Sequence, residues 1–248
     1  MQQLRRILLI TGGFYHDVDF VRLKLLRHLT RHEHIRVDVR ADYTTSLDLY
    51  DGILTYTCCV LPDEAQVAAL TAWIARGGRW FALHGTNSTL EIRPDGKVLT
   101  PDLSPALFQL LGSQFLAHPA PGRFRVNLGA PHPLTQGIDS FWVEDEHYLQ
   151  RYAEGNQVLL WSKFKGETPL FETSSWAGSQ QQTLYLRPHG KGAVLYLTLG
   201  HARGRYDMQP LMEHYPHVER GAWILPVFDR LLARGVDWMD RRLPLEAT

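Results

Sequence analysis

Short apolar runs that end at glycine or cysteine alternate with helical patterns through the first third of the chain. The runs are RRILLITGG (5–13), DGILTYTCCV (51–60) and RWFALHG (79–85). Between them, apolar residues recur at helical spacing from Val18 to Arg31, and again after Pro62-Asp63-Glu64, where a second helix begins. Strands that alternate with helices of this length predict βαβ units and a mostly parallel central sheet.

The carboxyl ends of parallel strands meet at one edge of a sheet, because right-handed crossovers return each strand in the same direction. Three loops then share that edge: GGFYHD (12–17), TYTCC (55–59) and LHGTNS (83–88). Ligands of open α/β sheets bind at this edge. His84, in the third loop, is therefore predicted to belong to a ligand site rather than only to steady a turn.

The second half of the chain follows a different pattern. A short helix is predicted from Ser104 to Leu111, and a final helix from about Trp223 to Trp238. Between them lie strand-like segments separated by Gly, Pro and Asn turns, including a hairpin with His189-Gly190-Lys191-Gly192 as its turn. We therefore expect extra β-hairpins in this half, within a single domain that spans 1–248 and has its core at about 6–240.

Charge balance and cysteine usage argue against several classes of protein. Lys and Arg together number 26, as do Asp and Glu, so no overall positive field favours nucleic acid or an anionic membrane. The apolar run at 7–10 is too short for a signal peptide and is interpreted as the first strand. Cys58 and Cys59, the only cysteines, form neither a disulfide framework nor a CxxC metal pair. We expect a cytoplasmic protein with no nucleic-acid or membrane partner.

Histidines and one acidic cluster are the candidates for chemistry. Five histidines fall at the ends of elements or beside turn residues, namely His16, His84, His118, His132 and His201, and of these His132 is expected to have a structural role in its turn. The acidic cluster Glu144-Asp145-Glu146 follows an aromatic pair. Imidazole and carboxylate groups suit both proton transfer near neutral pH and divalent-metal binding. Because adjacent residues on a strand point to opposite faces, only one of the pair 145–146 should face the site.

Several motifs, taken in chain order, resemble the trehalose-utilisation (ThuA-like) family. They are GGFYHD (12–17), FALHGT (81–86), FLAHP (115–119), HPLTQGIDSFWVEDEHY (132–148) and GKGAVLYLTLGH (190–201). The resemblance runs from about residue 6 to residue 240. It implies an α/β, flavodoxin-like three-layer sandwich similar to the class I glutamine amidotransferases.

The amidotransferase relatives keep a nucleophilic cysteine at a sharp strand-to-helix turn, a position that exposes a nucleophile beside backbone N–H donors. The corresponding turn in this chain is ALHGT, and it holds His84 instead. Cys58 and Cys59 follow a different strand and do not replace it. The resemblance therefore does not imply a cysteine-dependent glutaminase.

The resemblance implies carbohydrate metabolism, especially the use of trehalose or a related disaccharide through 3-keto sugars. A keto sugar has an acidic C–H beside its carbonyl, and enolisation there needs a base and an electrophile for the developing enediolate. Histidines and a carboxylate around a divalent metal, zinc or manganese, supply both. The leading hypothesis is a keto-sugar isomerase or lyase that takes a small-molecule carbohydrate and uses no nucleotide cofactor.

Roles for individual residues follow from this hypothesis. The candidate catalytic residues are His84, His16, Glu146 and Asp145. The candidate metal ligands are His118, His201 and His84, and the candidate substrate contacts are Asp17, Gly85 and Trp176. Many family members have an acidic residue directly after the last histidine, where this chain has Ala202; Asp207 is the acidic residue proposed to compensate.

Two other functions stay open at this point. One is a metal-assisted glycoside hydrolase, and the other is a non-catalytic carbohydrate-binding or assembly protein on an amidotransferase-like scaffold; a homo-oligomer is compatible with each. A two-carboxylate glycosidase fits less well, because the sequence presents one strong acidic cluster. An enzyme requires the histidines and Glu146 at one cavity, whereas a binding protein requires only aromatic and hydrogen-bonding walls.

Overall fold

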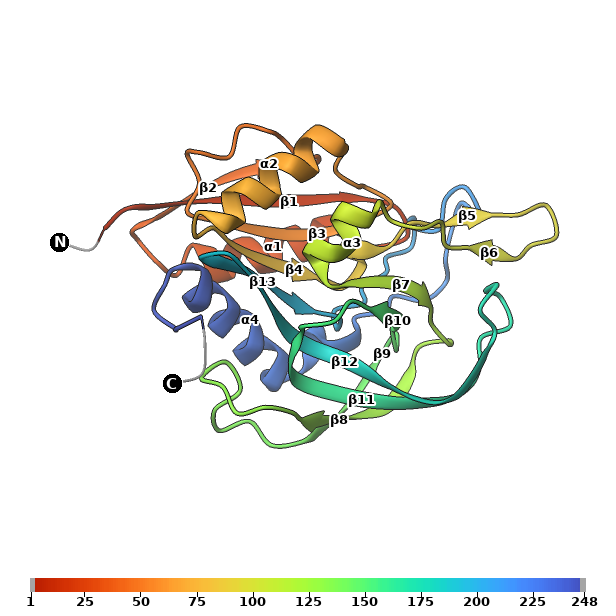
Figure 1. Cartoon of the computed structure of the whole chain (residues 1–248). Helices are drawn as coiled ribbons and strands as arrows, with labels where there is room; N and C mark the ends of the chain where they lie inside the picture. The colour runs from red at the N-terminus through yellow and green to blue at the C-terminus, as the bar shows by residue number, and fades with distance from the viewer. Residues whose placement is uncertain (1–2, 246–248) are drawn as a thin grey trace.

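The computed structural model describes residues 3–245 and contains a nine-stranded sheet with the order β2-β1-β3-β4-β13-β12-β11-β8-β9 (Figure 1). The first five strands in this order run parallel, and every later pair is antiparallel. The parallel strands are β1 (Arg5–Gly13), β2 (Ile35–Arg40), β3 (Gly52–Cys58), β4 (Arg79–Leu83) and β13 (Gly192–Leu197). The antiparallel strands are β8 (Gly122–Leu128), β9 (Phe141–Asp145), β11 (Gln157–Glu167) and β12 (Ser175–His189).

The predicted α/β class is confirmed, but the sheet is mixed rather than mostly parallel. The physical reason lies in the connections of the second half. β12 and β13 are joined by a tight hairpin in which His189 pairs with Gly192, at the predicted turn. A connection of this length can join only antiparallel neighbours, whereas parallel neighbours need a long crossover. The second half of the chain therefore adds antiparallel strands to the parallel part of the sheet.

Both faces of the sheet are covered, which explains why its central strands are apolar throughout. In β1, Ile7 and Leu9 belong to one buried cluster, while Leu8 and Ile10 belong to a second. The alternation of side chains along the strand sends these pairs to opposite faces. The core is thus divided into two layers by the sheet.

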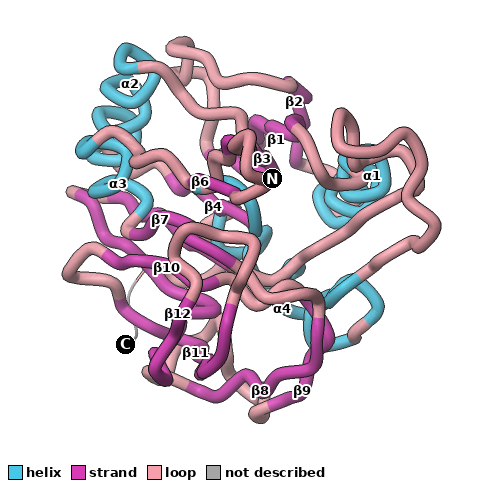
Figure 2. Tube along the Cα trace, turned by 90° about the vertical axis from the view of Figure 1, so that its right-hand side faces the viewer, coloured by secondary structure: helices cyan, strands magenta, loops and turns pink. Residues whose placement is uncertain are grey.

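Helices from both halves of the chain form the outer layers. The helices are α1 (Val18–Leu29), α2 (Glu64–Ala75), α3 (Pro105–Leu111) and α4 (Pro226–Met239). α1 and α4 contribute to the first buried cluster, whereas α2 and α3 contribute to the second, and Figure 2 shows α2 and α3 across the strands from α1. α4 begins later than predicted, because Pro226 takes its first turn and the preceding residues form a 3-10 helix (Gly221–Ile224).

Two small sheets lie outside the main sheet. β7 (Ser113–Ala117) pairs with β10 (Leu149–Tyr152), and β5 (Glu91–Ile92) pairs with β6 (Val98–Leu99). The β5–β6 hairpin projects beyond the end of the main sheet, on the same side of the molecule as the turn between β11 and β12 (Figure 1). Both segments border the cavity described below.

Candidate functional site

His84 stands at the sharp turn where β4 meets a short 3-10 helix (His84–Asn87). Its backbone has a φ of 45°, in the left-handed region that residues other than glycine adopt at a cost. The side chain is fully buried, and its Nδ1 lies 2.8 Å from the carbonyl oxygen of Thr198. Because a carbonyl oxygen only accepts, Nδ1 carries the proton, and the ring's lone pair is on Nε2.

His16 reaches the same point from the loop that follows β1. Its Nδ1 lies 3.1 Å from the carbonyl oxygen of Phe14, so Nδ1 is again the donor. The Nε2 atoms of His16 and His84 are 3.0 Å apart. Two lone pairs at this distance repel each other unless a proton or a metal ion lies between them. The backbone bonds therefore hold two imidazoles ready to share a cation.

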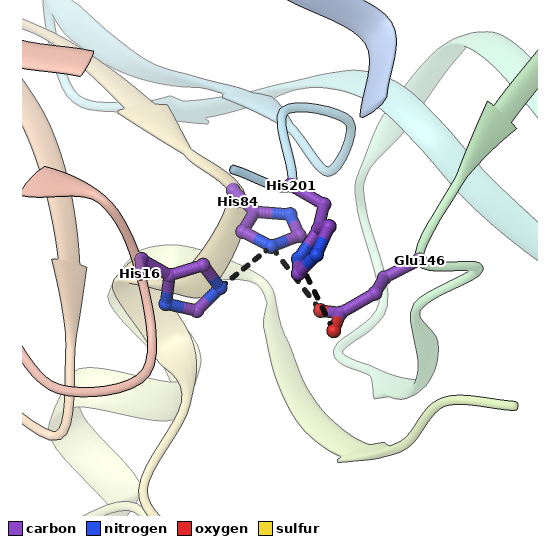
Figure 3. Close-up of side chains that lie close together, drawn as sticks. All are labelled: His16, His84, Glu146 and His201. Carbon is purple, nitrogen blue, oxygen red and sulfur yellow. Dashed lines mark hydrogen bonds and ion pairs between the residues drawn. The ribbon is translucent and has the colours of Figure 1, made fainter. Parts of the chain in front are cut away.

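Glu146 directly follows β9 and is 2% exposed. Its Oε2 lies 3.5 Å from Nε2 of His84, and its Oε1 lies 3.1 Å from Nδ1 of His201. The guanidinium of Arg203 contacts the same carboxylate at 3.2 Å. Figure 3 shows how His16, His84, His201 and this carboxylate point toward one another from separate segments.

His201 follows β13 and lies between two carboxylates. Its Nε2 is 2.5 Å from Glu219, which also accepts hydrogen bonds from Arg203 and the Tyr215 hydroxyl. Burial acts to lower the pKa of His201, but Glu146 and Glu219 outweigh it and raise this pKa to about 9. Binding of a metal at Nδ1 would therefore release a proton.

Burial and neighbouring charges also shift the pKa values of Glu146 and His16. Burial acts to raise the pKa of Glu146, but His118 and His201 outweigh it and hold this pKa well below its usual value. Burial, followed by the charge of His84, lowers the pKa of His16. At neutral pH the cluster thus combines an ionised carboxylate with at least one neutral imidazole.

The geometry of these side chains fits a metal ion. Within residues 3–245, the ligand atoms of His16, His84, Glu146 and His201 all lie within 4.8 Å of one another, and all four residues are buried. The outer nitrogen of each histidine is bonded to an oxygen, as is usual for imidazole ligands of metals. Three imidazoles and one carboxylate form a ligand set that suits zinc. This group could therefore hold a metal ion.

His118, a predicted metal ligand, lies beside this group rather than within it. Its Nε2 is 3.7 Å from Oε1 of Glu146, and its Nδ1–H donates to the carbonyl oxygen of Pro119 over 2.8 Å. The side chain is 23% exposed, more than those of the four clustered residues. The structure therefore groups His16 and Glu146 with the predicted ligands His84 and His201, and places His118 at the edge.

Asp145, a predicted catalytic residue, turns away from the histidines and binds backbone instead. Its carboxylate accepts N–H groups from Gly200 at 3.0 Å, His201 at 3.0 Å and Ala222 at 2.9 Å. It also accepts the N–H of Glu146 at 2.7 Å. Burial raises the pKa of Asp145. Of the two neighbours, Glu146 faces the site and Asp145 ties its strand to the turn that holds His201.

Asp17 and Gly85, two predicted substrate contacts, have clear packing roles. Asp17 is the N-cap of α1: it accepts the N–H of Phe20 at 3.1 Å and pairs with Arg220 at 3.1 Å. Gly85 is buried, and a Cβ added there would lie only 2.6 Å from the carbonyl oxygen of Thr57. Glycine at this position lets the turn after β4 pack closely against β3.

Trp176, the third predicted substrate contact, lies in β12 and is partly buried against a small apolar cluster. Its indole N–H donates to Oγ1 of Thr168 over 3.1 Å. None of Trp176, Asp17 and Gly85 lines the cavity next to the histidine cluster.

That cavity has a volume of about 590 Å³, and both polar and apolar side chains line it. We define its floor as His16, His118, Glu146 and Arg203, which border it where the histidine cluster lies. Tyr148 also borders the cavity, and its ring packs against that of His84 with 4.2 Å between the centroids. The volume is typical of small-molecule sites, so a ligand of sugar size can reach His118 and Glu146.

Cys58 also borders the cavity, in keeping with the predicted place of the TYTCC loop (55–59) at the ligand-binding edge. A contact with Cys59, at 3.9 Å between the sulfur atoms, and burial raise the pKa of the Cys58 thiol well above its usual value. A thiol of this kind stays protonated at neutral pH, which is unfavourable for a nucleophile.

Arg203 and Glu219 are site residues that the sequence did not reveal. Both come from the irregular segment after β13, and their backbones pair in an isolated antiparallel bridge. Glu219 is the carboxylate that contacts the outer nitrogen of His201, whereas Asp207 accepts the N–H of Gly204. Ala202, at the position where a family acid is usual, is fully buried.

The fold and the site together define an α/β protein with a buried histidine–carboxylate cluster at the carboxyl edge of its parallel strands. The model of the ThuA family, described as trehalose utilisation, matches residues 6–223. The chain therefore belongs to the ThuA family, which supports a carbohydrate-related role. The comparison with curated proteins gives no match.

Solved structures show the same fold at low sequence identity. A ThuA-like protein from Parabacteroides merdae has a TM-score of 0.64 and 16% identity, covering 99% of this chain and 93% of that one. A ThuA-like protein from Bacteroides uniformis has a TM-score of 0.64 and 18% identity, covering 96% and 93%. A β-galactosidase from Rahnella sp. R3 has a TM-score of 0.57 and 14% identity, covering 98% of this chain but 32% of that one.

In the part of the chain that the structure describes, no helix has the length and apolar character needed to cross a bilayer.

Proposed function

We propose that this protein acts on a 3-keto sugar derivative by moving a proton next to the carbonyl group, at the floor of the cavity. One observation carries the proposal: three buried imidazoles converge on Glu146, which belongs to this floor, and the outer nitrogen of each ring is already bonded to an oxygen. The family's description as trehalose utilisation supports a sugar as the substrate class.

The four clustered residues, His16, His84, Glu146 and His201, are the ones that would hold a divalent metal. Zinc suits this ligand set best, and manganese is the alternative. When bound, such a metal supplies a Lewis acid that polarises a carbonyl oxygen. The backbone bonds to His16 and His84 and the carboxylate of Glu219 fix the rings in the orientation that this task needs.

His118 is the proposed base. Its Nδ1–H is bonded to the carbonyl oxygen of Pro119, so its lone pair is on Nε2, on the side of Glu146. Burial lowers the pKa of His118, which keeps the ring neutral and able to take a proton at pH 7. Its position at the edge of the cluster, open to the cavity, leaves room for a substrate C–H.

Arg203 acts as a positioning residue in this scheme. It bridges Glu146 at 3.2 Å and Glu219 at 3.0 Å, so it fixes the two carboxylates that flank His201. Its pKa is raised: burial opposes the shift, and Glu146 and Glu219 outweigh it. The guanidinium therefore remains a permanent positive charge beside the cluster.

The test combines metal analysis of untagged protein with the reaction of a 3-keto disaccharide in D₂O. We expect about one zinc or manganese per chain and deuterium on the carbon next to the carbonyl. His118→Ala should lower kcat by about 10²–10⁴-fold, the usual range for a lost general base. His189→Ala, at the last residue of β12 and remote from the cavity, is the matched control and should behave as wild type.

Other results would select a different function. Cleavage by water without deuterium exchange would identify a glycoside hydrolase. Binding of the sugar without turnover would identify a carbohydrate-binding protein, and protein purified without metal that still turns over would remove the metal from the scheme.

A further inference from the structure

The cavity changes in character between its floor and its opening. Three segments wall its outer part: the β5–β6 hairpin, the turn between β11 and β12, and the segment after His201. Each contributes an exposed apolar side chain: Ile92 is 41% exposed, Leu170 64% and Leu211 50%. We define these three residues as the mouth. The floor, in contrast, contains His16 and Glu146, which are 6% and 2% exposed.

Apolar side chains also fill the wall between the floor and the mouth. Phe115 and Phe171 are nearly fully buried, and Val98 and Met208 border the same cavity. One continuous space therefore runs from the charged cluster to an exposed apolar opening. Contiguous apolar surface left open to water, and joined to a polar site, is typical of a ligand that has one polar and one apolar end.

Two hydroxyl groups of the outer wall are already engaged within the protein, and Glu167 is a charged group that stays exposed there. Oγ1 of Thr168 donates to the carbonyl oxygen of Thr173 over 2.7 Å and also accepts from Trp176. The Tyr215 hydroxyl donates to Glu219 over 2.8 Å. Hydroxyl groups of a second sugar ring beside Thr168, Tyr215 and the three mouth side chains would thus lose their water partners and find replacements only at Glu167, which is unfavourable.

We propose that the natural substrate is an aryl glycoside in its keto form, with the sugar ring at the floor and the aromatic aglycone at the mouth. This proposal rests on the function proposed above, which places the sugar ring at the histidine cluster. An aromatic ring has no hydroxyl network to satisfy, and it buries the exposed side chains of Ile92, Leu170 and Leu211. The mouth then determines specificity, while the floor performs the reaction.

The test compares two keto sugars on the protein as purified: the 3-keto derivative of phenyl glucoside and that of trehalose. We expect the KM for the aryl compound to be at least about 10-fold lower, which corresponds to about 1.4 kcal/mol. Leu170→Ser and Leu211→Ser should each raise the KM for the aryl compound about 5-fold or more, with a smaller change in kcat. Leu49→Ser is the matched control, because Leu49 is 62% exposed and does not line the cavity.

The outcomes separate this proposal from the proposed reaction. If neither compound is turned over, but calorimetry shows binding of phenyl glucoside that Leu170→Ser weakens, the reaction fails and the aglycone site stands. Equal KM values for the two keto sugars, unchanged by the mouth variants, would overturn the aglycone site and leave the reaction intact. Mouth variants that convert a dimer to a monomer without changing either KM would also overturn it, because the mouth would then be an interface between two copies.

Discussion

The parallel and the antiparallel halves of the sheet supply the cluster in different ways. His16, His84 and His201 follow the parallel strands β1, β4 and β13, whose carboxyl ends share one edge. Glu146 follows β9, the outermost strand on the antiparallel side. Backbone direction alone brings the histidines together, whereas the carboxylate must be brought in by tertiary contacts.

Asp145 makes the contact that joins the two halves. Its carboxylate binds three N–H groups from beyond β13, including that of His201, and Asp145 is the last residue of β9, directly before Glu146. Asp145 thus holds the backbone in place through its hydrogen bonds, and this leaves the neighbouring Glu146 free to contact the histidines. Substitutions of these two residues should have effects of different size. The largest effect is expected at Glu146, whose carboxylate faces the cluster.

Glu146→Gln should have the largest effect. It removes the charge that faces His201 and Arg203 and leaves buried cations without a partner, a change that usually costs about 3–5 kcal/mol of unfolding free energy. Metal content should fall, and turnover of a 3-keto sugar should be lost. Denaturant unfolding and elemental analysis measure both effects. Glu144→Gln is the control, since Glu144 is exposed on β9, two residues before Glu146; equal behaviour of the two variants would contradict the assignment.

Asp145→Asn should destabilise the protein by about 3 kcal/mol, because an amide offers its NH₂ group to N–H donors that need an acceptor. Metal affinity should fall by about 10–100-fold, the range for residues that orient ligands. Denaturant unfolding and metal titration measure these changes, with the exposed Asp139→Asn as control. An Asp145→Asn protein of normal stability that has lost turnover would return Asp145 to the catalytic residues.

The sequence predicted the parallel half well, since its signals are local. Apolar runs ended by glycine mark β1 and β4, and the predicted helix after Pro62 begins with a capping box between Asp63 and Gln66. The antiparallel half showed strand patterns and one hairpin, but alternation along a strand does not tell which strand it pairs with or in which direction. The mixed sheet therefore could not be derived.

The site residues also differ in whether local sequence signals could predict them. His16 and His84 were predicted from their places at strand ends, and the alternation rule showed that only one of Asp145 and Glu146 faces the site. Which one does so depends on the turn that follows β9. Glu219 lies 18 residues beyond His201 in an irregular segment, so its contact depends on tertiary folding and left no sequence signal.

His147 tests the antiparallel half apart from the site. Its ring stacks on Phe124 with centroids 4.0 Å apart and bonds to Ser162, and burial lowers its pKa to about 4. The folded-state pKa lies below the unfolded value of about 6.5, so the unfolded chain takes the proton first and stability falls as pH drops from about 6.5 toward 4. Between pH 7 and pH 5 this contribution is about 2 kcal/mol.

Denaturant unfolding of wild type and His147→Gln at the two pH values measures the contribution of His147. The variant should lose about 2 kcal/mol less than wild type on going from pH 7 to pH 5. The same pH dependence in both proteins would show that other groups, such as His28 and His132, carry the acid sensitivity; burial lowers the pKa of each of them as well.

Trp176 should give the smallest effect and tests whether the antiparallel half touches the sugar. Trp176→Phe removes the bond to Thr168, which should cost about 1 kcal/mol of unfolding free energy. Because Trp176 does not line the cavity, the KM for the keto form of trehalose should stay within about twofold of wild type. Loss of a direct sugar contact worth about 1.4 kcal/mol would instead raise this KM tenfold. A tenfold rise in this KM with an intact fold would place the indole against the sugar face, as the sequence suggested. In that case the antiparallel half would supply a wall for the substrate's sugar ring as well as the carboxylate of Glu146.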